Sequence, residues 1–221
     1  MRKTICFIVL LITLAPLAFA GPEKFQESVN YFEIFPSYPG TDAGKVEVLE
    51  FFWYNCPHCN DFEPHLEQWL SRKPEGVEFA QVPVIFMGRD GRPNAAGKLH
   101  AETFYSLELM GKLKALHGVI FNAIHGQRIS LDTPAAMEKF LAEKGIDAEQ
   151  FRNTRQSFAV QTRVNRAIEL AKRFGIDGVP NLVVGGTYRT GPTGSFEGMT
   201  QLVDFLIAKV KDEQKSATKA Q

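Results

Sequence analysis

Two cysteines, Cys56 and Cys59, enclose the dipeptide Pro57-His58. Two thiols at this spacing on the first turn of a helix can reach each other and form a disulfide without large backbone movement. The chemistry of such a pair is thiol–disulfide exchange, in which the thiolate is the reactive species. The sequence therefore predicts a redox-active site at residues 56–59.

The flanking segments place this pair between a buried strand and a helix. Residues 46–53 are rich in Val, Leu, Phe and Trp, the composition of a strand covered on both faces. From Pro57, which suits the first helical position, to about residue 71 apolar residues recur at helical spacing. The two thiols must therefore lie at the point where the strand ends and the helix begins.

A helix N-terminus favours negative charge on a nearby sulfur, through its free N–H groups and the positive end of its dipole. We expect Cys56 to be the exposed, acidic thiol and Cys59, one turn further, to be shielded. His58, if protonated, would stabilise the Cys56 thiolate further. A stabilised thiolate stabilises the reduced dithiol, so the disulfide is expected to act as an oxidant.

A structural disulfide and a zinc site are the alternatives for this pair. A structural disulfide normally links distant segments, and so short a loop constrains the unfolded chain little. A zinc site requires roughly four ligands, and the third cysteine, Cys6, lies in a segment that we expect to be removed. A C-x-x-C beside a strand–helix–strand pattern favours redox chemistry, so we expect no metal.

The first twenty residues are typical of a signal peptide. Arg2 and Lys3 precede an apolar run over residues 5–14, and Ala18 and Ala20 supply the small residues of a cleavage site. The run is short for a membrane span. We expect cleavage after Ala20 and export of the mature chain.

The composition limits the partners of the mature chain. The 221 residues carry 25 basic and 25 acidic side chains, and this balance argues against nucleic acid or an anionic membrane as the main partner. Without a scaffold of disulfides, stability must come from an apolar core, which a chain of this length can form.

The remaining segments suggest an interrupted α/β pattern. Residues 21–45 are expected to form an extended lead-in or edge strand, and residues 77–82 a strand parallel to the first. Residues 89–157 form a succession of helical patterns, followed by a long helix, a short strand at 181–184, a hairpin and a last helix over 199–211. The polar tail, 212–221, is expected to be disordered.

This order of elements, with an X-Pro before the hairpin, resembles the thioredoxin fold. Together with the helical segment, the signal peptide and the Cys-Pro-His-Cys motif, it resembles the periplasmic DsbA-type thiol:disulfide interchange proteins. Further matches are Glu50-Phe51-Phe52, Pro74-Glu75-Gly76-Val77, Phe86-Met87-Gly88 and Gly178-Val179-Pro180. The resemblance implies an α/β, thioredoxin-like fold with an inserted all-helical domain: residues 21–88 and 158–211 form the thioredoxin-like domain, and 89–157 the insertion.

The resemblance also implies an activity. A periplasmic oxidase of this kind donates its Cys56–Cys59 disulfide to folding exported proteins with free thiols, through a mixed disulfide at Cys56 that Cys59 resolves. No other cofactor is implied, and a quinone-linked inner-membrane protein of the DsbB type restores the disulfide. A cis peptide bond at Val179-Pro180 is implied to face the cysteines, where the Val179 backbone could pair with an extended client segment. We expect a monomer.

Glu50 is a carboxylate in an otherwise apolar strand. Burial would raise its pKa, and a protonated Glu50 beneath the cysteines could exchange a proton with Cys59. The alternative is a strand-end glutamate that reaches solvent, as Glu47 would. Related proteins often pair this acid with a lysine on the neighbouring strand, where the spacing places Gln81 in this chain, so its charge pairing stays open.

Other residues are assigned to the core or to a groove. His117 falls on the apolar helix face of Leu113 and Ile124, Trp53 is expected in the core, and Phe86-Met87 are expected to rim a groove for unfolded polypeptide. Two alternative functions remain: a disulfide isomerase or reductase on the same fold, and a peptide-binding chaperone with incidental cysteines.

Overall fold

A mixed five-stranded sheet forms the centre of the computed structural model, which describes residues 24–38 and 44–219. Its strands follow the order β1-β5-β4-β2-β3. They are β1 (Tyr31–Glu33), β2 (Val46–Phe52), β3 (Val77–Pro83), β4 (Asn181–Val184) and β5 (Tyr188–Thr190). The central strand β2 pairs parallel to β3 and antiparallel to β4. The expected signal peptide lies outside the described residues.

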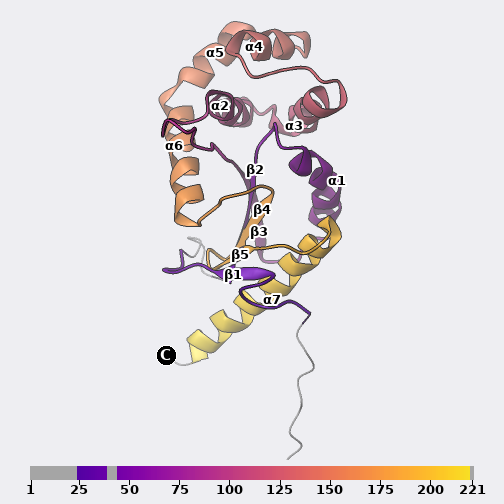
Figure 1. The fold of residues 1–221 in the computed structure, drawn as a ribbon, viewed down its shortest axis with the longest axis vertical. Helices are drawn as coiled ribbons and strands as arrows, with labels where there is room; N and C mark the ends of the chain where they lie inside the picture. Colours follow the sequence, from indigo (N-terminus) through magenta and orange to yellow (C-terminus); the bar gives the residue numbers. More distant parts are fainter. Residues whose placement is uncertain (1–23, 39–43, 220–221) are drawn as a thin grey trace, which may run out of the picture.

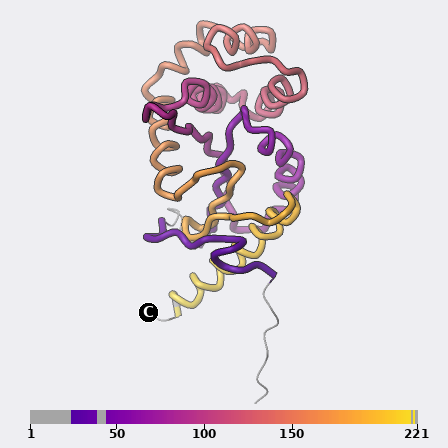
Figure 2. Tube along the Cα trace, in the orientation of Figure 1, coloured from indigo at the N-terminus to yellow at the C-terminus, as the bar shows by residue number. Residues whose placement is uncertain are grey.

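The helices divide into those that cover the sheet and those gathered at one end of it (Figure 1). They are α1 (Pro57–Ser71), α2 (Ala95–Leu109), α3 (Leu113–Phe121), the π-helical turn η1 (Asn122–Gly126), α4 (Pro134–Glu143), α5 (Ala148–Gln156), α6 (Phe158–Arg173) and α7 (Phe196–Lys219). The Cα trace leaves the sheet after β3, builds α2 to α5 beyond its end and returns along α6 to β4 (Figure 2). This is a thioredoxin-like fold with helices inserted between two halves of the sheet.

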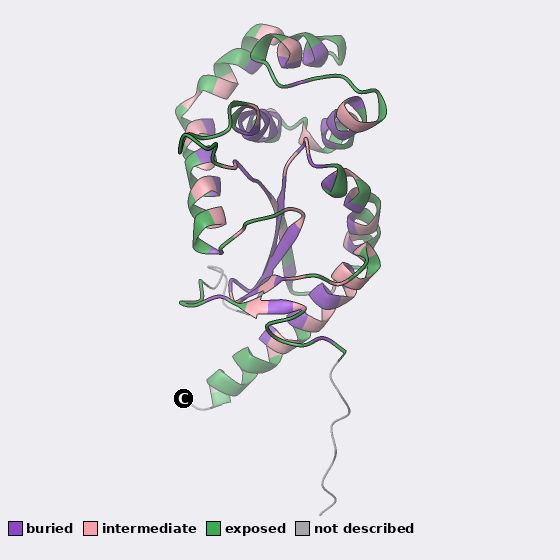
Figure 3. Cartoon of the chain, in the orientation of Figure 1, coloured by how far each residue is buried: buried purple, intermediate pink, exposed green. Residues whose placement is uncertain are grey.

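The apolar core has two parts, one on each face of the sheet. Phe62 and Trp69 of α1 pack with Leu206 of α7 against one face. On the other face Phe51 and Phe174 belong to a cluster that continues into the inserted helices. Because both faces are covered, β2 and β4 are almost entirely buried (Figure 3). Burial on both faces fixes the strand that leads into Cys56.

Most of the predicted elements near the motif are confirmed. The helix after the motif spans residues 57–71, β2 and β3 are parallel, and β1 in the lead-in is an edge strand paired with β5. Among the described residues, no helix has both the length and the apolar character needed to cross a membrane.

The prediction of a disordered tail from Asp212 is wrong. The last helix continues to Lys219, eight residues beyond the predicted end at Lys211. A tertiary contact holds this extension: Tyr188 donates a hydrogen bond from its hydroxyl to Glu213 Oε1 at 2.7 Å. Directly before the extension, Lys211 Nζ donates to the Glu75 carbonyl at 2.9 Å. The tail is polar, but it contains Lys, Glu, Gln and Ala, which are good helix formers, so its polarity alone did not indicate disorder.

Candidate redox site

Cys56 is the residue that caps the N-terminus of α1. Its backbone is extended, with φ −84° and ψ 114°, and Pro57 occupies the first turn. The Cys56 N–H donates to the Trp53 carbonyl at 2.9 Å, which fixes the turn between β2 and the helix. Both thiols are free in this structure.

The accessibility of the two thiols differs less than predicted. Cys59 is fully buried, as expected, but Cys56 is only 9% exposed, whereas Pro57 and His58 are exposed. The prediction of an exposed Cys56 is therefore wrong in degree, although Cys56 is the more accessible of the pair. The segment before β4 accounts for part of this cover, since the Cys56 thiol donates to the Val179 carbonyl at 3.4 Å.

The Val179-Pro180 peptide bond is cis, as the resemblance implied. Val179 is far from Cys56 in sequence and both it and Pro180 are partly buried, so only the fold brings this backbone to the mouth of α1. Close by, Phe32, Arg189 and Met199 line an open pocket of about 460 Å³ together with Val179 and Pro180. An extended peptide at Cys56 would therefore meet the Val179 backbone first.

The surroundings shift the pKa values of the two thiols in opposite directions. Together these influences lower the pKa of Cys56 to about 6. A hydrogen bond from the Cys59 thiol is the largest of them, and partial burial opposes it. The N–H groups of Cys59 and His58 and the charge of His58 also act to lower this pKa. Burial first, and then the neighbouring Cys56, raise the pKa of Cys59. The site therefore favours a thiolate at Cys56 beside a protonated Cys59.

Glu50 lies in β2 and is fully buried, so the alternative of a solvent-reaching glutamate is excluded. The pKa of Glu50 is raised to about 8, first by burial and then by the Glu63 carboxylate, while a hydrogen bond from Gln81 acts to lower it. Gln81 is the register partner of Glu50 on β3, as the spacing predicted, and its Nε2 donates to Glu50 Oε2 at 2.8 Å. Glu50 in turn raises the pKa of Cys59, so the two groups are electrostatically linked.

Sequence reasoning missed a set of polar side chains around Gln81. His117 Nε2 lies 3.1 Å from Gln81 Nε2 and 3.4 Å from Glu63 Oε1, and His117 Nδ1 lies 2.8 Å from the Tyr54 hydroxyl. The prediction that His117 lies on the apolar, inward face of its helix is confirmed, because the ring is packed by Phe52, Phe104 and Phe121. No pattern along the chain indicates its polar partners.

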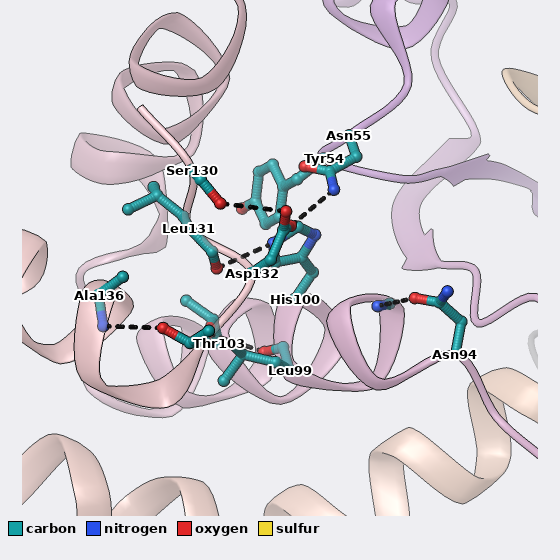
Figure 4. A network of polar contacts seen from close by, with 12 residues as sticks. Tyr54, Asn55, Asn94, Leu99, His100, Thr103, Ser130, Leu131, Asp132 and Ala136 are labelled. Carbon is teal, nitrogen blue, oxygen red and sulfur yellow. Dashed lines mark hydrogen bonds and ion pairs between the residues drawn. The ribbon is translucent and has the colours of Figure 1, made fainter. Parts of the chain in front are cut away.

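A second polar cluster ties the segment before Cys56 to the inserted helices (Figure 4). Asn55 Nδ2 donates to Asp132 Oδ1 at 2.7 Å, and the Tyr54 carbonyl lies 2.8 Å from His125 Nε2. His100, from α2, lies 3.2 Å from the Leu131 carbonyl through Nε2. The inserted helices therefore hold both residues that precede the motif.

An apolar groove of about 380 Å³ runs between the loop after β3 and α6. Phe86 and Met87 rim it, as predicted, facing Ile168 and Ala171. Trp53 is partly buried and packs against the core, as predicted, with its ring edge-on against Phe86 at 6.0 Å. Among the described residues, no three His, Cys, Asp or Glu side chains gather as metal ligands would.

Comparisons with known proteins agree with this geometry. A model of the DSBA-like thioredoxin domain family matches residues 47–204. The chain is 41% identical over 219 residues to the thiol:disulfide interchange protein DsbA of Burkholderia cepacia, covering 97% of this chain and all of that protein. It is 38% identical to DsbA of Pseudomonas aeruginosa strain PAO1, covering 86% of this chain and 88% of that protein.

Solved structures of the same kind of protein also match the chain. The crystal structure of Pseudomonas aeruginosa DsbA matches with a TM-score of 0.79 at 36% identity, covering 88% of this chain and 98% of that one. The oxidoreductase NmDsbA1 from N. meningitidis matches with a TM-score of 0.73 at 30% identity, covering 86% and 96%. With a reactive thiol pair at the mouth of α1 and relatives matched over nearly their whole length, the chain belongs to the DsbA-like thioredoxin family and is a thiol:disulfide oxidoreductase.

Proposed function

We propose that this oxidoreductase acts as a protein-disulfide oxidase, which donates the Cys56–Cys59 disulfide to reduced proteins that fold in the periplasm. The observation that carries the proposal is the opposite shift of the two thiols: the pKa of Cys56 is lowered to about 6 and that of Cys59 is raised. A thiol with a low pKa is a good leaving group, so a client bound to Cys56 is released readily.

The reaction begins when a client thiolate attacks Sγ of Cys56. The Cys56–Cys59 bond breaks, and Cys59 leaves with the electron pair and takes up one proton, which Glu50 can supply. A second client thiolate then attacks the client sulfur of the mixed disulfide, and Cys56 leaves as a thiolate. The client loses two electrons and two protons; the enzyme keeps both electrons and one proton, and the other proton goes to solvent.

The surroundings of Cys56 suit an unfolded client. The Val179 backbone beside the sulfur can pair with an extended segment, with Pro180 fixing the turn that presents it. The apolar groove beside Phe86 and Met87 can hold apolar side chains of the same client. Pro57 and His58 face the client at the open end of α1, where His58 supports the Cys56 thiolate.

The cellular setting completes the proposal. The signal peptide is cleaved after Ala20, the mature chain works as a monomer in the periplasm, and the Cys56–Cys59 disulfide is its only redox group. A quinone-linked inner-membrane protein of the DsbB type reoxidises it. Residues 21–88 and 158–211 serve as the thioredoxin-like domain, 89–157 as the inserted domain, and the last helix extends to Lys219.

The test is transfer of the disulfide to a reduced protein that contains two cysteines. Oxidised residues 21–221 are mixed with this client, and loss of client thiols is followed under anaerobic conditions. We expect stoichiometric oxidation by the wild type and none by Cys56→Ser. A chaperone with incidental cysteines would retain its effect on the client in Cys56→Ser. An isomerase would rearrange a client with wrong disulfides faster than it oxidises a reduced one.

A further inference from the structure

The pocket beside the redox site contains a guanidinium group that the proposed reaction does not use. Arg189 of β5 lines the open pocket of about 460 Å³ that also includes Val179 and Pro180. The Val179 carbonyl accepts the Cys56 thiol at 3.4 Å, so one residue contacts the reacting sulfur and forms part of the pocket. An extended client rises about 3.3 Å per residue. A client joined to Cys56 therefore reaches the pocket within a few residues of its own cysteine.

The guanidinium lies over an aromatic ring that is tightly packed. Arg189 and Phe32 are register partners on β5 and β1, and Cζ of Arg189 lies 4.6 Å from the centre of the Phe32 ring. The loop after β5 approaches this ring at Gly191, where a Cβ would lie 2.8 Å from Phe32 Cε2 and 3.0 Å from the Asn30 carbonyl oxygen. The packing limits the motion of the ring, and the cation–π contact holds the guanidinium above it.

The donors of this guanidinium are free to bind a ligand. Among the residues that the structure describes, no side chain and no carbonyl pairs with the Arg189 guanidinium. Asp177, the other charged residue in the lining of the pocket, is exposed and forms no ion pair with it. A guanidinium carries five N–H donors and can bind a carboxylate through two parallel hydrogen bonds. The pocket therefore suits a ligand that carries a carboxylate.

We propose that Arg189 is a specificity-determining residue, which binds a carboxylate side chain of the client within about three residues of the cysteine that attacks Cys56. The inference rests on the proposed function and names the clients of the same site: proteins with Asp or Glu close to a reactive cysteine. Pro180 and Met199 give the pocket apolar surface, which suits the aliphatic part of such a side chain.

The first test is the titration of a client carboxyl that is held at the site. Peptides with one cysteine, an amidated C-terminus and one carbon-13-labelled Glu, placed at each position up to three residues from the cysteine, are joined to Cys56 of Cys59→Ser through a thiopyridyl leaving group. NMR follows the Glu carboxyl from about pH 3 to about pH 7. At one or more positions we expect its midpoint to fall below that of the free peptide by on the order of half a pH unit.

The charge of Arg189 should account for this fall. Added Arg189→Gln should return the midpoint to that of the free peptide, and Arg189→Glu should raise it further, because like charges disfavour ionisation. Arg173→Gln is the matched control, since Arg173 lies over the Tyr38 ring at 4.3 Å but does not line the pocket. A purely structural role for Arg189 would not reverse the sign of the shift.

The second test measures the preference between clients. Oxidised wild type reacts with peptides that contain two cysteines and either Glu or Gln at the position found in the first test. We expect the Glu peptide to react roughly threefold faster at low salt, and the advantage to shrink at about 0.5 M salt. In Arg189→Gln the two rates should be equal. A defect in folding would instead slow both peptides alike and leave their ratio unchanged.

The proposal is overturned if the tethered Glu titrates as in the free peptide at every position, a result that needs no variant of Arg189. It is also overturned if Arg173→Gln abolishes the shift as Arg189→Gln does. The tether is made chemically and involves no oxidation of a client, so a failure here leaves the oxidase assignment standing. If disulfide transfer failed instead, a shifted midpoint would still identify a peptide subsite beside Cys56.

Discussion

The surroundings of Cys56 and those of Cys59 differ, although the residues lie one helical turn apart. Cys56 lies at the mouth of α1, where N–H groups and His58 favour its thiolate and the Val179 carbonyl is within 3.4 Å. Cys59 lies beneath, fully buried and electrostatically linked to the buried carboxyl of Glu50. The difference separates two tasks: the sulfur of Cys56 exchanges bonds with the client, and the sulfur of Cys59 holds a proton.

The largest effect is expected from removing each sulfur in turn. Cys59→Ser should accumulate a covalent client complex through Cys56, because nothing remains to resolve the mixed disulfide. Cys56→Ser should form no such complex and lose transfer altogether, because the remaining thiol is buried. Non-reducing electrophoresis after mixing with a client disulfide measures both. Equal trapping by the two variants would show that the two sulfurs are equivalent.

Because the pKa of the buried Glu50 is raised, the free energy of unfolding should depend on pH, and Glu50→Gln should remove this dependence. The pKa of Glu50 is raised from 4.5 to about 8 in the folded protein, so its contribution is fully present below pH 4.5 and is lost as the pH rises through 8. Between these values the wild type should lose on the order of 5 kcal/mol relative to Glu50→Gln. Denaturant unfolding of the reduced proteins across this range measures the difference. If the free energies of unfolding of the two proteins changed in parallel with pH, the pKa of Glu50 would be the same in the folded and unfolded states.

The lowered pKa of Cys56 at the N-terminus of α1 predicts the opposite dependence of the free energy of unfolding on pH. The folded pKa of Cys56 is lowered from 9.0 to about 6, so the stability from its thiolate is present above pH 9.0 and lost as the pH falls through 6. Relative to reduced Cys56→Ser, the reduced wild type should gain on the order of 2 kcal/mol over this window, after a discount for partial solvation. Denaturant unfolding again measures it. The oxidised protein should show no such gain.

The smallest effect is expected at the exposed rim. The charge of His58 is the last of the influences that lower the pKa of Cys56, so His58→Ala should raise that pKa by less than about one unit. Thiolate absorbance in the ultraviolet as a function of pH measures this. Glu50 should titrate unchanged in the same variant, because His58 faces solvent. A change at Glu50 would show that the rim and the interior are not separate.

The parts of the site that depend on residues close together in the chain could be predicted from the sequence. The apolar run before Cys56 and the helical spacing after it predicted the junction of β2 and α1. The family resemblance, with the spacing from Pro74-Glu75-Gly76, predicted Gln81 opposite Glu50 on the neighbouring strand, as the register confirms. These features depend on pairing within one strand–helix–strand unit, which sequence patterns describe well.

What could not be predicted depends on contacts between distant segments. The polar partners of His117 come from β3, from α1 and from the residue after β2, and no periodicity within α3 reports them. The cover over Cys56 comes from Val179, far along the chain. The extension of α7 is held by Tyr188, which donates to Glu213, whereas the polar character of the tail alone suggested disorder.

The equilibrium of residues 21–221 with glutathione tests the central claim most directly. Trp53 reports the redox state, because its carbonyl accepts the Cys56 N–H and its ring lies beside the site. We predict a disulfide that a small amount of reduced glutathione already reduces, and a reduced form that resists denaturant better than the oxidised form. A disulfide that survives a large excess of reduced glutathione would contradict the account and would identify a reductase on the same fold.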